Sequence, residues 1–211
     1  MKRIAMSVLV VVGGLWASSA LAEIGLTKGM SIFALQFTNG VSDIEAPAPP
    51  SYIGGAQVND AGAQAEFSHL LKDDYAFTVN VGTTLSKMTL ASSTTTSPDL
   101  TQKISGLNVR VGGDYVAHLS SKLHLLIGPG LEWKSAKVKR DNGTTVTESN
   151  TANRIGFSGR MSAHMRLASH VGLKGFVGHH FGYASVKNAA GAKASWWSGG
   201  NFGGGGLAID W

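Results

Sequence analysis

The sequence predicts an all-β fold, an eight-stranded antiparallel up-and-down transmembrane β-barrel. Three observations support this prediction. Segments with an apolar residue at every second position recur along the chain, and the connections between them alternate between long and short. After residue 22, no stretch approaches the ~18 consecutive apolar residues that a membrane-spanning helix needs. Strands in lipid must pair every backbone polar group within the protein, so they must close into a barrel.

The first 22 residues have the features of a secretory signal peptide. Lys2 and Arg3 precede an apolar run from 4 to 16, and Ala20-Leu21-Ala22 forms an A-x-A cleavage site. We therefore expect residues 1–22 to be removed by cleavage after Ala22, leaving 23–211 as the barrel domain. The sequence has no cysteine, which excludes a disulfide framework and thiolate metal sites.

Composition argues against nucleic-acid binding. Without Lys2 and Arg3, 16 basic and 13 acidic residues remain, a net charge of +3, and the basic residues are spread along the chain rather than clustered.

Glycine is frequent, with 28 residues, and many glycines fall inside the expected strands. In a narrow barrel, glycine allows sharp curvature and leaves room inside.

Eight strands are expected in chain order. In the sixth, Ile155, Phe157 and Met161 alternate with Ser158 and Arg160, so one face is apolar and the other polar. The predicted strands occupy residues 27–37, 61–71, 75–90, 104–117, 122–135, 154–167, the segment between Ser169 and residue 186, and 201–211.

The connections predict the orientation in the membrane. The long ones, 39–60, 91–102, 137–153 and 186–199, alternate with short turns at 72–74, 118–121 and near Ser169. Such barrels keep short turns in the periplasm and long loops outside. The outward aromatic residues are expected to form a girdle at each membrane surface: Tyr75, Tyr115 and Trp211 at the periplasmic surface, and Trp133, Phe181 and Tyr183 at the extracellular surface.

The last strand carries a family resemblance. Leu207, Ile209 and Trp211 share one face, and the chain ends on the aromatic residue. The sequence here resembles the small outer-membrane β-barrels of Gram-negative bacteria, such as OmpX and the transmembrane domain of OmpA. Members of that family usually end in phenylalanine, where this chain has Trp211. The resemblance implies a bacterial outer-membrane location, contact with membrane lipids and lipopolysaccharide, and recognition of the three residues by the barrel-assembly machinery.

The inward face is rich in charge. Eight strands enclose a lumen that side chains nearly fill, and buried charges persist when paired. We expect Glu66 to pair with Arg110 or Arg160. The full charge network is expected to contain Glu66, Arg110, Asp114, Glu132, Arg160, Arg166 and Lys174.

Two other functions have weaker support. Some eight-stranded outer-membrane barrels hydrolyse acyl chains of lipid A with a histidine and a serine. Here His179 and Ser185 share a face but are six residues apart, roughly 20 Å along a strand, which is too far for contact. His179 and His180 point to opposite faces, so the sequence predicts no metal site and no cofactor.

The alternative fold is a soluble lipocalin-like barrel, which would turn its apolar face inward around a ligand.

The sequence therefore predicts a non-enzymatic outer-membrane barrel with a structural or surface-interaction role. Extracellular loops would carry this role toward a ligand or host surface. Paired aromatic residues are typical of binding hot spots, so Trp196 and Trp197, expected in the last loop, are the candidate contact. The alternative is a narrow pore through the charged lumen that weakly prefers anions, because basic residues outnumber acidic ones there.

Overall fold

A computed structural model describes residues 25–43, 52–53, 58–92, 100–141, 146–187 and 193–211. The predicted signal peptide lies outside the described residues, as do 44–51, 54–57, 93–99, 142–145 and 188–192 of the predicted loops. Side chains are described for 25–40, 61–85, 103–139, 151–187 and 193–211. In the described residues, no helix is long and apolar enough to cross a membrane.

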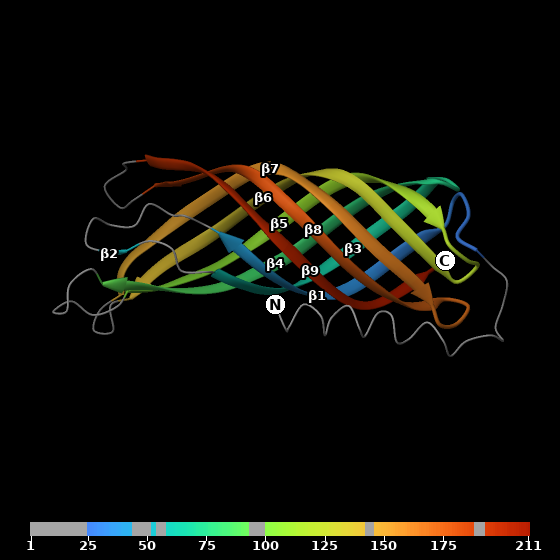
Figure 1. The fold of residues 1–211 in the computed structure, drawn as a ribbon, viewed down its shortest axis with the longest axis horizontal. Helices are drawn as coiled ribbons and strands as arrows, with labels where there is room; N and C mark the ends of the chain where they lie inside the picture. The colour runs from blue at the N-terminus through green and yellow to red at the C-terminus, as the bar shows by residue number, and fades with distance from the viewer. Residues whose placement is uncertain (1–24, 44–51, 54–57, 93–99, 142–145, 188–192) are drawn as a thin grey trace.

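Eight long antiparallel strands close into one barrel (Figure 1). Each long strand pairs with its neighbours in the chain, and the β1–β9 and β4–β5 ladders complete the ring. The strands are β1 (Ser31–Asp43), β3 (Val58–Lys72), β4 (Tyr75–Ser92), β5 (Leu100–His118), β6 (Leu123–Asp141), β7 (Val146–Arg166), β8 (Val171–Lys187) and β9 (Lys193–Asp210). A two-residue strand, β2 (Tyr52–Ile53), pairs with the end of β4. The predicted fold class is confirmed.

The ladders are strongly staggered. A row of directly paired residues that starts at Phe33 on β1 returns to β1 at Asp43, ten residues further along. The row passes through Phe67, Val79, Val111, Leu131, Phe157, Phe181 and Gly199. Eight strands with this stagger tilt by about 40° from the barrel axis and leave a narrow interior.

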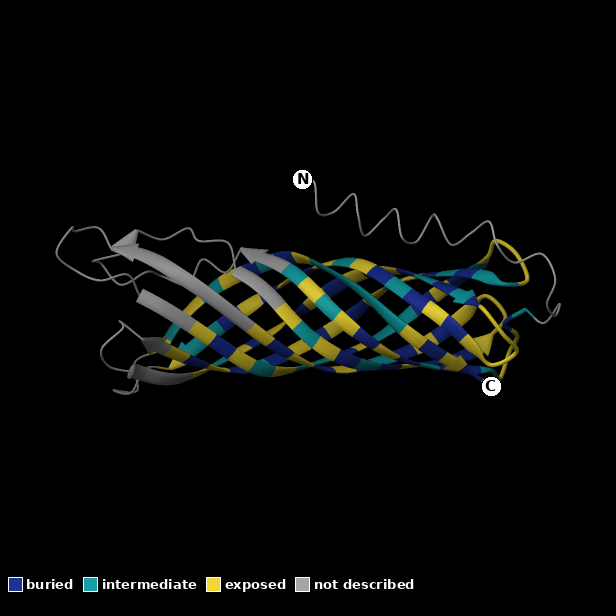
Figure 2. Ribbon diagram, turned by 90° about the horizontal axis from the view of Figure 1, so that it is seen from below, coloured by how far each residue is buried: buried dark blue, intermediate teal, exposed yellow. Residues whose placement is uncertain are grey.

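Where side chains are described, buried and exposed residues alternate along the long strands except at residues 202–206 of β9, and Figure 2 shows the resulting checkerboard. On β7, Arg154, Ser158 and Arg160 are buried in the lumen, while Ile155 and Phe157 are exposed on the outside. The apolar face therefore points outward, as expected for a barrel in lipid. A soluble barrel with an apolar lining is excluded by this arrangement.

The start of β1, the C-terminus and the three short turns lie at one end of the barrel (Figure 1). Following the topology of outer-membrane barrels, this end is called the periplasmic end and the opposite one the extracellular end. The strands extend further toward the extracellular end than predicted: β6 reaches Asp141, and β7 begins at Val146. The sequence predicts that each strand ends where the apolar alternation ends. In the structure, polar residues continue the ladders, because strand pairing needs only the backbone.

Two further predictions, the loop position of Trp196 and Trp197 and the start of the first strand, are wrong. Trp196 and Trp197 belong to β9 rather than to a loop, because their backbones pair with Ala184 and Tyr183 on β8. The first strand begins at Ser31 rather than near residue 27. The preceding residues turn into the mouth of the barrel instead.

Glycine is required where the neighbouring backbone leaves no room for a Cβ atom. At Gly206 on β9, an added Cβ would fall on the backbone carbonyl oxygen of Leu35 on β1. At Gly159 on β7, by contrast, an added Cβ would meet nothing within 4 Å.

This contrast predicts opposite effects of alanine. Gly206→Ala should lower the free energy of unfolding by about 1–3 kcal/mol, because the backbone must shift to admit the methyl group. Gly159→Ala should leave it unchanged or raise it by up to about 1 kcal/mol, because alanine restricts the unfolded chain. Urea titration of the barrel folded into lipid vesicles measures both. Equal stability of the two variants would contradict the prediction that a methyl group meets the neighbouring backbone at Gly206 and not at Gly159.

Candidate functional site in the barrel lumen

A buried carboxylate with two cationic partners occupies the middle of the lumen. Glu66 on β3 forms salt bridges with Arg160 on β7 and Lys174 on β8, one to each carboxylate oxygen. Arg160 also donates to Asn80 Oδ1 at 2.7 Å, and Ser68 donates to Glu66 at 3.1 Å. We call Glu66, Arg160 and Lys174 the ionic layer. The layer joins opposite walls of the barrel and crosses the lumen.

Arg110, the other expected partner of Glu66, pairs with Asp114. It lies 3.6 Å from Asp114 and donates to Ser158 Oγ at 2.9 Å, rather than pairing with Glu66. Asp114 in turn accepts a hydrogen bond from Thr78 at 2.7 Å. Of the two expected partners of Glu66, Arg160 is the one that pairs with it. Arg110 instead bends along its own strand toward Asp114.

The remaining predicted lumen charges form bridges nearer the two ends. Glu132 pairs with Arg154 toward the extracellular end. Arg166 pairs with Asp210 toward the periplasmic end. All seven residues of the predicted charge network are buried inside the barrel. Among all buried charged side chains that the structure describes, six are basic and four acidic, so the lumen carries an excess of positive charge.

The sequence reading missed an apolar plug at the periplasmic end. Leu26, which precedes β1, is only 2% exposed and packs inside the barrel mouth with Met30 beside it. A tight turn directs this segment inward: Gly29 has φ +88° and donates its backbone N–H to Leu70 O at 2.8 Å. The buried members of the plug are Leu26, Ile32, Ala34, Leu70, Ala76, Val116, Leu126 and Ala208.

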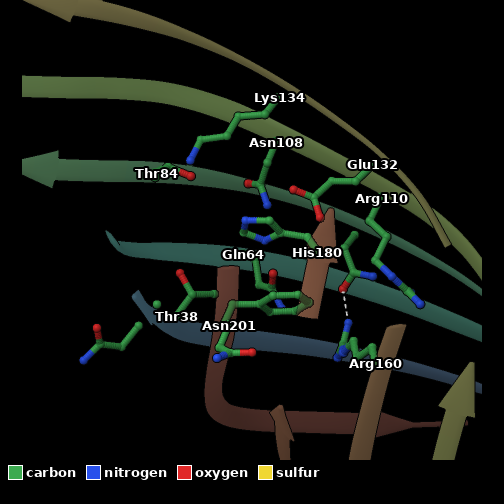
Figure 3. Close-up of a pocket in the computed structure, with 14 residues that line it drawn as sticks. Thr38, Gln64, Thr84, Asn108, Arg110, Glu132, Lys134, Arg160, His180 and Asn201 are labelled. Carbon is green, nitrogen blue, oxygen red and sulfur yellow. Dashed lines mark hydrogen bonds between the residues drawn. The ribbon is translucent and has the colours of Figure 1, made fainter. Parts of the chain in front are cut away.

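A polar cavity lies on the extracellular side of the ionic layer. Its volume of about 60 Å³ has room for about four water molecules. Figure 3 shows side chains from opposite walls gathered around His180. His180 Nε2, Arg110 Nη1 and Asn80 Nδ2 are buried and have no hydrogen-bond partner among the described residues, so the cavity wall is rich in donor groups.

The rings of His180 and Phe202 line one side of this cavity, and Phe176 lies next to Phe202. Phe202 on β9 points inward and stacks on His180, with ring centroids 5.7 Å apart. Arg160 lies over the ring of Phe176, 4.4 Å from its centroid, at a distance suited to a cation–π contact. Neither phenylalanine was singled out from the sequence. The glycines around Phe202 hid the strand alternation that identifies it as an inward residue.

The histidines show no catalytic or metal-binding arrangement in the described residues. His179 faces outward and shares a hydrogen bond of 2.9 Å with Asn201. In the described residues, a hydrogen bond between a serine and a histidine joins Ser31 and His69 near the periplasmic end, at 3.0 Å. No group of three His, Cys, Asp or Glu residues in the described part of the chain could hold a metal ion.

The outer face carries the other predicted residues. All six girdle residues are exposed, and their position at the membrane surfaces stays a prediction. Leu207, Ile209 and Trp211 also face outward, and their role in assembly stays a prediction. Trp197 is exposed and stacks on Phe181 at 5.0 Å, so it extends the extracellular aromatic cluster along the barrel wall.

Known structures share this architecture. OprG of Pseudomonas aeruginosa is similar to this chain at 12% identity with a TM-score of 0.59, over 89% of this chain and 98% of OprG. The chain has the fold of a small outer-membrane β-barrel. This fold fits the bacterial outer-membrane location predicted from the sequence. No family profile and no curated protein matches the sequence.

Two further barrels are similar in fold. The attachment invasion locus protein Ail of Yersinia pestis, in complex with the heparin analogue sucrose octasulfate, has 10% identity and a TM-score of 0.51, over 87% of this chain and 99% of Ail. The outer membrane protein AlkL, in lipid bilayers, has 14% identity and a TM-score of 0.50, over 92% of this chain and 94% of AlkL. At these identities the similarity concerns the fold alone.

The ionic layer predicts an uneven response to charge removal. Glu66→Gln leaves Arg160 and Lys174 buried without their counter-charge, so the free energy of unfolding should fall by about 3–5 kcal/mol. Adding Lys174→Met removes one of the two excess cations and should restore part of this loss. Urea titration in lipid vesicles compares the variants with the native barrel. A native-like midpoint for Glu66→Gln would show that the layer does not stabilise the fold.

Proposed function

We propose that this protein is a non-conducting outer-membrane barrel with a structural or surface-interaction role carried at its extracellular end. The observation that supports this proposal is the double closure of the lumen. The ionic layer crosses the middle, and the apolar plug fills the periplasmic mouth. A solute that entered from outside would reach the polar cavity and stop there.

Both closures resist opening for physical reasons. Separating Glu66 from Arg160 and Lys174 would leave charges unpaired in a site where all three side chains are at most 5% exposed. Withdrawing Leu26 would expose an apolar cluster to water. The two closures involve different residues and different forces, so opening one does not open the other.

The extracellular end offers a platform for contacts outside the cell. The strands there extend the barrel beyond the predicted girdle: β6 continues for eight residues past Trp133, to Asp141. The connections at this end lie outside the described residues. Ail, a barrel of similar fold, is named an attachment invasion locus protein, and this name supports surface interaction as the class of function to test first.

A narrow pore is the second candidate. It is favoured by the two cationic partners of Glu66, which offer alternative pairings, and by the excess of buried basic residues. If this lumen conducts, anions should pass more readily than cations.

Single-channel recording in a planar lipid bilayer distinguishes the two candidates. The native barrel, refolded in detergent and shown to be folded by its heat-dependent gel migration, should give no reproducible openings. A variant with Glu66→Ala, Arg160→Ala, Lys174→Ala and Leu26→Gly removes the ionic layer and takes the Leu26 side chain out of the plug, so it should conduct more readily than the native barrel. Reproducible native openings that change with Glu66→Gln or Arg110→Gln would reject the non-conducting barrel and establish the pore.

A further inference from the structure

The outer face repeats one pattern on four strands at the extracellular end. Moving away from the membrane, a large apolar or aromatic residue is followed two positions later by serine and two positions after that by lysine. The sets are Leu107, Ser105 and Lys103 on β5; Trp133, Ser135 and Lys137 on β6; Tyr183, Ser185 and Lys187 on β8; and Trp197, Ser195 and Lys193 on β9. All four lysines are exposed.

The register places lysines directly opposite one another. Lys103 on β5 pairs with Lys139 on β6, and the backbone of Lys103 pairs on its other side with Lys87 on β4. On β8 and β9, Lys187 pairs with Lys193. Directly opposed like charges destabilise a sheet, with Cβ atoms about 5 Å apart. An anion between the paired ammonium groups would remove this repulsion.

The described protein side chains supply no such anion. On the outer face of the extracellular half, the side chains that the structure describes include no aspartate or glutamate. The periplasmic end differs, because the turn that follows Lys72 there contains Asp73 and Asp74. Asp73 accepts a hydrogen bond from the backbone of Lys28 at 2.6 Å. The unbalanced positive charge in the described structure therefore belongs to the extracellular surface.

The level of the lysines identifies the anion. Four residues along a strand tilted by about 40° rise roughly 10 Å along the barrel axis. Trp133, Tyr183 and Trp197 suit the boundary between acyl chains and headgroups. The ammonium groups then lie among the headgroups, where the outer leaflet of a Gram-negative outer membrane carries the phosphates of its glycolipid. The ammonium group of lysine is a compact, charged donor that suits phosphate.

We propose that these lysines form two binding sites for the phosphates of lipid A in the outer leaflet. Lys103, Lys137 and Lys139 form the first site, on β5 and β6. Lys187 and Lys193 form the second, on β8 and β9. The proposal rests on the outer-membrane location and is independent of whether the lumen conducts, so silence or openings in a bilayer recording do not bear on it.

The test compares two lipids on the full folded chain in detergent. Bisphosphorylated lipid A and the same lipid without phosphates are titrated separately, and bound lipid is counted by native mass spectrometry. The native protein should bind the phosphorylated lipid about tenfold or more tightly than the other, and added salt should weaken this binding. Lys103→Gln, Lys137→Gln and Lys139→Gln together should remove most of the difference.

A matched control carries Lys28→Gln and Lys72→Gln at the periplasmic end and should bind as the native protein does. If the triple variant does not fold, Lys187→Gln with Lys193→Gln tests the second site alone, with a smaller expected loss. Equal affinity for the two lipids, or equal losses in the control and the lysine variants, would overturn the proposal. Tighter binding of soluble sucrose octasulfate than of lipid A by the same lysines would also overturn it, in favour of an external polyanion.

Discussion

The need to pair every backbone polar group within the protein governs this structure. In lipid, no water is present to hydrogen-bond with the N–H and C=O groups of a strand, so the eight strands pair all the way round, and the β1–β9 ladder closes the ring. Eight strands with a stagger of ten residues enclose little space. The narrow interior then decides which inward residues fit: glycine stands where the neighbouring backbone leaves no room for a Cβ atom, and long side chains cross the lumen.

The side chains that line the lumen differ in polarity along its length. Apolar side chains occupy the periplasmic mouth, paired charges occupy the middle, and a small polar cavity lies beyond them. The first two regions have a physical reason. Leu26 can cover the mouth because no strand needs to continue there, and Glu66 is tolerated at 1% exposure because two cations neutralise it. The cavity lies beside the stacked rings of Phe202 and His180.

The residue types on the outer surface change along the barrel axis. Apolar residues cover the middle, aromatic residues follow, and lysines extend furthest on β5, β6, β8 and β9. The lysines share a surface with no described acidic side chain, although a sheet of this kind would gain stability from opposite charges across its strands. Their placement is therefore more informative about the surroundings of the barrel than about its folding.

The sequence by itself determined the fold class and the direction of most side chains. Because side chains alternate with a period of two, Arg160 and Phe157 fall on opposite faces in any register, and the short turns fix which strands are neighbours. Local pattern could not give the far ends of the strands. Trp196 and Trp197 follow no apolar alternation, so the local pattern predicts a loop there, whereas backbone pairing with β8 places them in a strand.

Only the tertiary structure decided which residues meet across the lumen. Glu66 is 94 residues from Arg160 and 108 from Lys174 in the chain, and a ladder stagger that no local pattern encodes brings the three to one level. The same stagger left Arg110 to pair with Asp114. The plug required the fold as well, because Leu26 lies outside every strand and is buried only once the closed barrel provides a mouth for it.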